Sequence, residues 1–306
     1  HEQTEGNPFF IEELVNALVE HGRLIWNEQE MHYGLAPGLT VEMLAGAVPQ
    51  GIRAAIGARL DRLEPETQQV LGLAAIIGRH FSQEILNRFG SAHGLSEEGV
   101  ERALGYAKSA RFLASLEGEA ERLGDIPGFT SRAPEIEADY AFDHPLIHQV
   151  VYGELDRRRR RRLHAEVGYL LEDLYRGREG LHVERLAYHF LESDDDAKAR
   201  EYSVAAGDKM LRAYYDPDMA LGYYLPALEM VVGKETSLRH LGPKSPVPIR
   251  RGFVHRFTPE ERNTVVAYLG DILKAVRETP AAKAVAQLAN QICVAALHMG
   301  EVYEAS

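Results

Sequence analysis

The sequence predicts a mainly α-helical fold, and three observations carry this prediction. Apolar residues recur at three- and four-residue spacing along most of the chain, which is typical of helices with one buried face. Ser, Asn and Pro stand at the starts of these segments, and Gly stands at several ends, as expected of helix caps. Only two short segments, near Leu24–Trp26 and Tyr140–Phe142, read as extended. We therefore expect helices with a small β-hairpin.

The composition indicates a globular chain of about two domains. At roughly 150 residues per domain, 306 residues suit two, and 45% apolar residues suffice to bury their cores. No stretch approaches the roughly 18 uncharged apolar residues of a membrane helix, and the single cysteine, Cys293, predicts no internal disulfide. We expect a cytoplasmic chain that does not contact a membrane. A net charge of −12 disfavours non-specific binding to nucleic acid.

The ends of the sequence predict a segment of a longer protein. The first residue is His1 rather than Met, and helical periodicity begins almost at once. The last residues, 300–306, read as a helix in mid-course with no stop signal.

Residues 1–63 read as helices that flank a short extended segment. Asn7 and Pro8 suit the cap and first position of the first helix, and Gly22 suits its end. A second helix opens at Pro49 and carries apolar residues on one face as far as Leu63.

Residues 64–155 read as three short helices followed by a hairpin, which is the layout of a winged helix. The helix that opens at Pro65 is apolar almost all round and should lie in the core. Ser82 and Ser96 should cap the next two helices, and we extend the apolar stripe of the last one to Leu113. Residues 114–138 read as a long loop before the predicted strand at 140–142.

Residues 156–306 read as a helical repeat array. Ala220, Tyr224 and Ala227 match the small–aromatic–small pattern in the second helix of a tetratricopeptide repeat, although Ser203 occupies the aromatic position of the helix before. The stretch at about 233–258 is rich in Pro and Gly and reads as an insertion.

The sequence carries none of the common catalytic motifs. A phosphate-binding G-x-x-x-x-G-K-[ST] loop, a zinc-binding H-E-x-x-H and a G-x-S-x-G elbow are all missing. His182 and His189 lie seven residues apart, but without a carboxylate or Cys partner they make a poor metal site and are expected at the surface. We therefore predict no enzymatic activity for this chain alone.

Three stretches in this order resemble the C-terminal half of STAND-class signalling ATPases. They are Thr4–Leu14 with Gly-Asn-Pro, Val48–Phe81 with Arg-Leu-Asp and Ile-Ile-Gly-Arg, and Phe142–His164 with its six arginines. The nearest likeness is to large bacterial regulators in which an AAA-type ATPase module accompanies a class III nucleotide cyclase, a LuxR-type DNA-binding domain or a kinase. The resemblance covers roughly residues 1–230.

The resemblance implies three domains and part of a nucleotide site. Residues 1–63 would be a lid remnant of the ATPase, 64–155 the winged helix and 156–306 the repeats. Gly6, Asn7 and Pro8, with Phe9, would pack beside the adenine and ribose of ATP or ADP. His144 would donate an imidazole N–H to the β-phosphate of ADP. The ATPase core would precede His1, so we expect no nucleotide bound to this chain by itself.

Simpler structural roles are open for the same residues. Asn7 and Pro8 are a helix cap whatever else they do, and a His before a Pro often caps a turn or helix. Most of the arginines at 157–162 should face solvent, since Leu163 and Val167 mark the buried side of that helix.

Three functions are weighed for the chain. The first is a regulatory segment of a nucleotide-switched ATPase, whose repeats receive a protein partner or a small-molecule inducer. The alternative is a helical scaffold for protein partners with no nucleotide role. DNA binding by the winged helix is disfavoured, because Glu97, Glu98 and Glu101 would face the phosphates.

Overall fold

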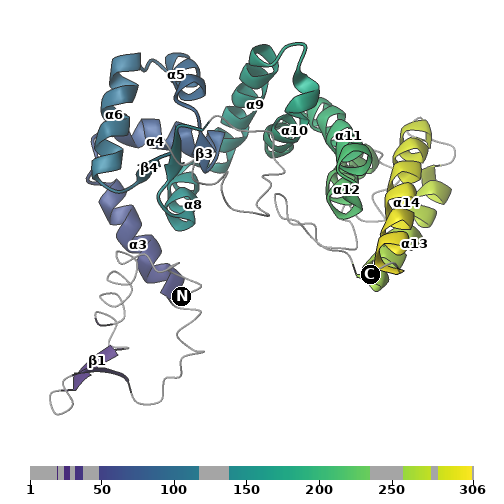
Figure 1. The fold of residues 1–306 in the computed structure, drawn as a ribbon, viewed down its shortest axis with the longest axis horizontal. Helices are drawn as coiled ribbons and strands as arrows, with labels where there is room; N and C mark the ends of the chain where they lie inside the picture. Colours follow the sequence, from purple (N-terminus) through teal and green to yellow (C-terminus); the bar gives the residue numbers. More distant parts are fainter. Residues whose placement is uncertain are drawn as a thin grey trace. The chain divides into compact units, whose positions relative to one another are not determined.

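The computed structural model describes residues 19, 24–27, 32–36, 48–116, 138–234, 258–276 and 282–304 (Figure 1). This part of the chain is mainly helical, as predicted. Two compact units are present, His1–Asp156 and Arg157–Ser306. Nearly all of the first predicted helix and of the predicted insertion lies outside the described residues.

The segment predicted to be extended forms a short antiparallel hairpin. Strand β1 (Leu24–Asn27) pairs with β2 (His32–Leu35), with Leu24 opposite Leu35 and Trp26 opposite Tyr33. The extended prediction for Leu24–Trp26 is thus confirmed.

The core of the first unit is built around one helix that is buried on nearly every side. This helix is α4 (Pro65–Ile77), which packs against α5, α6 and α8 (Figure 1). The surrounding helices are α3 (Val48–Leu60), α5 (Gln83–Ser91), α6 (Glu97–Ser109) and α8 (Pro145–Glu154). The prediction of a core helix, made because its residues are apolar almost all round, is confirmed.

Local signals fix where these helices begin and end. The Ser82 hydroxyl accepts a hydrogen bond from the Ile85 N–H at 3.2 Å, and the Ser96 hydroxyl accepts one from the Gly99 N–H at 3.1 Å. Both are the predicted N-caps, and each satisfies a donor that the helix cannot pair internally. Gly78 ends α4 with a φ of 144°, a conformation that glycine adopts without a steric penalty.

A three-stranded antiparallel sheet completes the first unit. Strands β3 (His80–Phe81), β5 (Tyr140–Phe142) and β4 (Leu113–Ser115) lie in that order, with β5 in the middle. The predicted strand at Tyr140–Phe142 is confirmed, and two further strands pair with it. The order helix, strand, helix, helix, strand, strand is compatible with a winged helix, which stays a prediction.

The sequence prediction was wrong at the end of α6. Leu113 does not continue the helical stripe but begins β4. The helix ends at Ser109, and Arg111 adopts a left-handed φ of 54°, which turns the chain into the strand. The side chains of Phe112 and Leu113 are buried, although the backbone that carries them is not helical. Their apolar character therefore indicated burial in the core and not a helix.

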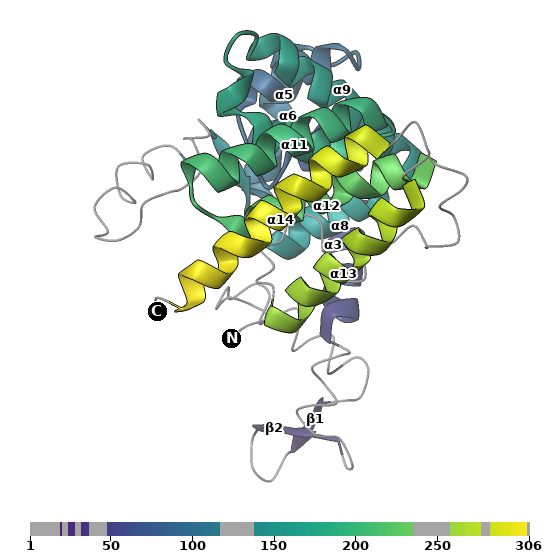
Figure 2. The same ribbon diagram turned by 90° about the vertical axis from the view of Figure 1, so that its right-hand side faces the viewer.

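The second unit is a succession of packed helices (Figure 2). They are α9 (Arg157–Leu174), the 3₁₀ turn η1 (Glu179–Leu181), α10 (Val183–Glu192), α11 (Asp196–Ala213), α12 (Pro217–Lys234), α13 (Pro259–Val276) and α14 (Ala282–Glu304). From α9 to α12 each helix packs mainly against the next in sequence. Beyond α12 the order changes, because α14 packs along α12 while α13 packs against α14.

A single apolar core joins α12 to the last two helices. Leu221, Tyr224 and Leu228 on α12 belong to the same buried cluster as Leu269 on α13 and Ile292 on α14. Each helix therefore packs against the next in sequence from α9 to α12 and again in the pair α13–α14. The contact between α12 and α14 joins these two parts. The tetratricopeptide designation of these repeats stays a prediction.

Candidate functional site

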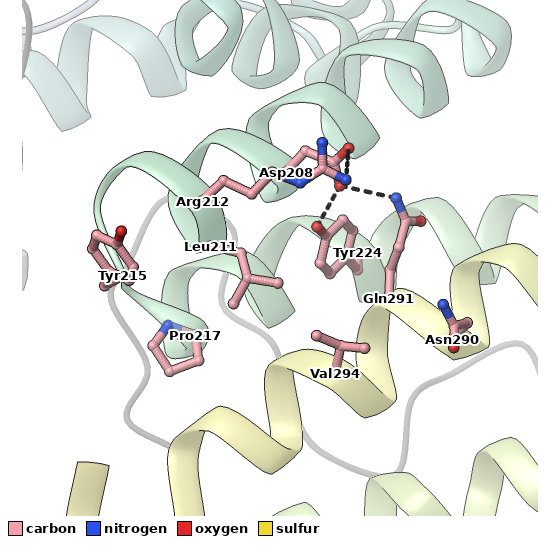
Figure 3. A pocket seen from close by; sticks show the side chains of 9 residues that line it. All are labelled: Asp208, Leu211, Arg212, Tyr215, Pro217, Tyr224, Asn290, Gln291 and Val294. Atoms are coloured by element: carbon pink, nitrogen blue, oxygen red, sulfur yellow. Dashed lines mark hydrogen bonds and ion pairs between the residues drawn. The ribbon is translucent and has the colours of Figure 1, made fainter. Parts of the chain in front are cut away.

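A pocket of about 450 Å³ lies among α11, α12 and α14 in the second unit (Figure 3). Its volume falls within the range of small-molecule sites in proteins. The residues that line it are Asp208, Leu211, Arg212, Tyr215, Pro217, Tyr224, Asn290, Gln291 and Val294.

Asp208 is the polar centre of this pocket. Its Oδ1 atom accepts hydrogen bonds from the Tyr224 hydroxyl at 2.6 Å and from Gln291 Nε2 at 2.9 Å (Figure 3). One carboxylate from α11 thus holds side chains of α12 and α14 in fixed positions. Burial and the hydrogen bond to Asp208 raise the pKa of Tyr224, so the phenol stays protonated and acts as a donor.

The position of Tyr224 depends on a glycine in the facing helix. Tyr224 is completely buried, and a Cβ atom built on Gly207 would collide with its ring at Cε1. Gly207 therefore allows α12 to approach α11 closely enough for the hydroxyl to reach Asp208. The sequence pointed to Tyr224 as the aromatic residue of a small–aromatic–small pattern, and the structure places Gly207 opposite it.

The rest of the pocket combines an apolar wall with a charged rim. Leu211 on α11 and Val294 on α14 project into the space between these helices (Figure 3). Arg212 Nη2 lies 3.6 Å from Asp208 Oδ2, and the Arg212 side chain is largely exposed. Tyr215 stands in the turn between α11 and α12 and is 80% exposed.

The chemistry of the lining favours binding over bond cleavage. The nine lining residues include no Ser, Cys or His that could act as a nucleophile or a proton shuttle. The carboxylate of Asp208 is already engaged by two donors and an arginine. An apolar wall with a few fixed polar groups is the usual composition of a ligand pocket.

The predicted nucleotide residue His144 caps α8. Its Nδ1 atom accepts a hydrogen bond from the Leu146 N–H at 3.1 Å, and the residue is only 5% exposed. A neutral ring that accepts at Nδ1 carries its proton at Nε2, and that atom is buried as well. The cap role is thus present, and contact with the β-phosphate of ADP stays a prediction.

The other predicted nucleotide residues cannot be placed beside it. Gly6, Asn7, Pro8 and Phe9 lie outside the described residues.

A buried pair of histidines corrects one expectation. His189 is not at the surface but fully buried on α10, where its Nδ1 atom lies 3.0 Å from Nδ1 of His164 on α9. His182 is half-buried and stacks on Tyr175 with ring centroids 3.6 Å apart. His189 can lie on the buried, apolar face of α10 because His164 on α9 forms a hydrogen bond with one of its ring nitrogens. In the described ranges, no three His, Cys, Asp or Glu residues are grouped so that they could hold a metal ion.

No protein-family model, curated protein or solved structure matches this chain. The resemblance to STAND-class ATPases therefore rests on the three sequence stretches alone. Within the described helices, none has the length and apolarity needed to cross a membrane.

Sequence reasoning missed most of the pocket. Asp208 and Gln291 are far apart in the chain and meet only because α14, rather than α13, packs along α12. One local signal was available at Tyr215, an aromatic that follows the C-cap residue of α11, where glycine would be usual.

Proposed function

We propose that this chain is a regulatory segment of a signalling protein and that its helical unit Arg157–Ser306 is the receptor for a small-molecule inducer. The observation that carries this proposal is the pocket in which Asp208, Tyr224 and Gln291 form a fixed polar centre beside an apolar wall. Such a site is largely preformed, so a ligand would pay little to order it.

A ligand in this pocket would act on the junction that completes the helical unit. It would contact α11, α12 and α14 together, and α14 makes the main packing contact that joins the last helix pair to α12. Binding to the assembled form alone would stabilise that assembly in proportion to ligand concentration. An inducer could therefore change how readily α13 and α14 separate from the preceding helices.

The nucleotide part of the proposal comes from the sequence resemblance. In a parent protein of the kind that the resemblance implies, the unit His1–Asp156 would supply Gly6, Asn7, Pro8, Phe9 and His144 to an ATP or ADP site that a separate ATPase core would complete. The segment itself would hydrolyse no nucleotide, because it carries no phosphate-binding loop motif.

A scaffold without a nucleotide role is the second candidate, and the geometry of His144 favours it. Its Nδ1 atom already serves as an α8 cap, and its ring is buried. DNA binding is disfavoured, because Glu97, Glu98 and Glu101 are all exposed on α6.

A screen of small soluble fragments against the 306-residue chain tests the receptor proposal. Ligand-detected NMR should find fragments that bind. Hydrogen–deuterium exchange should then show slower amide exchange in α11, α12 and α14 when these fragments are present. If the bound fragments protect only other helices, or if none binds at millimolar concentration, the pocket is not a receptor site.

A further inference from the structure

Tyr215 occupies a backbone conformation that its side chain does not favour. Its φ is 53°, in the left-handed region, where a non-glycine residue meets steric strain. Helices often end in this conformation, but the residue there is usually Gly or sometimes Asn. Tyr215 is also 80% exposed, so burial of its ring does little to offset the strain. Folding alone therefore gives no reason for an aromatic residue at this position.

The pocket gives such a reason, because Tyr215 is one of its lining residues. Strained backbone positions cluster at ligand sites, where the side chain acts on the ligand. Leu211, Pro217 and Val294 supply apolar surface in the same pocket. A planar ring inserted there would gain both apolar burial and an aromatic contact with Tyr215.

The charged side chains of the pocket decide which polar group the ligand can carry at the end away from its ring. Asp208 Oδ1 already accepts hydrogen bonds from Tyr224 and Gln291. Its Oδ2 atom lies 3.6 Å from Arg212 Nη2, so a ligand cation at that oxygen would meet the guanidinium charge. Asp216, next to the pocket, is engaged as well, since its Oδ1 atom caps α12 by accepting from the Met219 N–H at 3.0 Å.

Arg212 is the positively charged residue of the lining, and it has donors to spare. Its guanidinium carries five N–H groups, and its contact with Asp208 is a long one of 3.6 Å from an exposed side chain. A guanidinium of this kind binds a carboxylate through two parallel hydrogen bonds.

From these observations we infer that the pocket takes a small aromatic carboxylate, with its ring against Tyr215 and its carboxylate on Arg212. This inference rests on the proposed receptor function and narrows it to one ligand class.

Titration of the 306-residue chain with 2-naphthoate, and in parallel with the uncharged 2-naphthamide, tests the inference. The acid should bind about tenfold more tightly than the amide, as expected for one charge-assisted contact. Arg212→Gln should remove this preference by lowering the affinity for the acid to about that for the amide.

Tyr215→Gly is the most discriminating variant, because its effects on stability and on binding should have opposite signs. It should raise the melting temperature by relieving the left-handed strain, while weakening the binding of both compounds about fivefold. Stronger folding with weaker binding cannot be explained by a damaged fold. Tyr215→Asn, which tolerates the same backbone conformation, should behave in the same way.

Three results would overturn the inference: no detectable binding of 2-naphthoate, equal affinity for the acid and the amide, or unchanged affinity in Tyr215→Gly. If the fragment screen still finds neutral or cationic ligands that protect α11, α12 and α14, the receptor proposal survives and the ligand class is wrong. If that screen also finds no ligand in the pocket, both fail.

Discussion

His164 Nδ1 and His189 Nδ1 lie 3.0 Å apart in the interior of the second unit. A hydrogen bond between these atoms requires that one ring donates and the other accepts, so the two neutral rings are different tautomers. The pair joins α9 to α10 in a region where both side chains are at most 1% exposed. Tyr188 packs its ring against both imidazoles.

This pair predicts that the second unit loses stability as the pH falls from about 6.5 toward 4. Burial first, and the nearby charge of Arg160 second, lower the pKa of His164 from 6.5 to about 4. Burial, together with His164 and Arg185, also lowers the pKa of His189. The unfolded chain therefore binds more protons than the folded chain in this range, and acid favours unfolding. The lowered pKa of His164 alone should make the free energy of unfolding on the order of 3 kcal/mol higher above pH 6.5 than below pH 4.

Urea unfolding, followed by circular dichroism between pH 7 and pH 5, measures this effect. The double variant His164→Leu with His189→Leu should show a flatter dependence of the unfolding free energy on pH than the native chain. His182→Gln, which changes a half-buried histidine, serves as the control and should keep most of the native slope. Equal slopes in the native chain and the double variant would show that the pair does not titrate on unfolding.

Gly207→Ala should destabilise the packing of α11 against α12. The added Cβ would collide with the Tyr224 ring, which is fully buried and tied to Asp208. Overpacking of this kind costs about 1–3 kcal/mol. Gly222→Ala on α12 is the matched control, since no atom lies within 4 Å of its added Cβ, and it should be neutral or stabilise by up to about 1 kcal/mol. Similar urea midpoints for the two variants would contradict this account of the close approach.

His144 substitutions separate its cap role from its proposed nucleotide role. His144→Ala should lose about 1 kcal/mol of stability, because the Leu146 N–H loses its acceptor, whereas His144→Asn keeps a capping oxygen and should retain most of it. In the proposed parent protein, a contact of His144 with the ADP phosphate would make both variants release ADP faster. If His144→Asn retains ADP as the native protein does while His144→Ala does not, the residue acts only through the cap.

The pattern of local signals explains what could be predicted from the sequence. Ser82, Ser96 and Gly78 act within one turn of their own helices, and the apolar face of α4 follows from its own residues. Strands β3 and β4 span only two and three residues, too few for an alternating pattern to appear. Their existence depends on pairing with β5, which is contributed by a distant segment.

The pocket and the histidine pair were beyond local reasoning for a related reason. Gln291 reaches Asp208 only through the packing of α14 along α12, which skips α13. His189 was expected at the surface because its hydrogen-bond partner, His164, lies on another helix. The sequence around either histidine gives no sign of this partner.

The central claim is that the pocket among α11, α12 and α14 binds a ligand, and a pair of tryptophan variants on one helix tests it most directly. Val294 lines the pocket, whereas Leu297, one turn further along α14, is 71% exposed and is not among the lining residues. Fragments that bind the native chain in ligand-detected NMR should lose binding to Val294→Trp, whose indole fills the pocket, and keep binding to Leu297→Trp. Circular dichroism should first show that both variants retain the native helical content. Undiminished binding to a folded Val294→Trp variant would contradict the claim, because the ligand would then sit elsewhere.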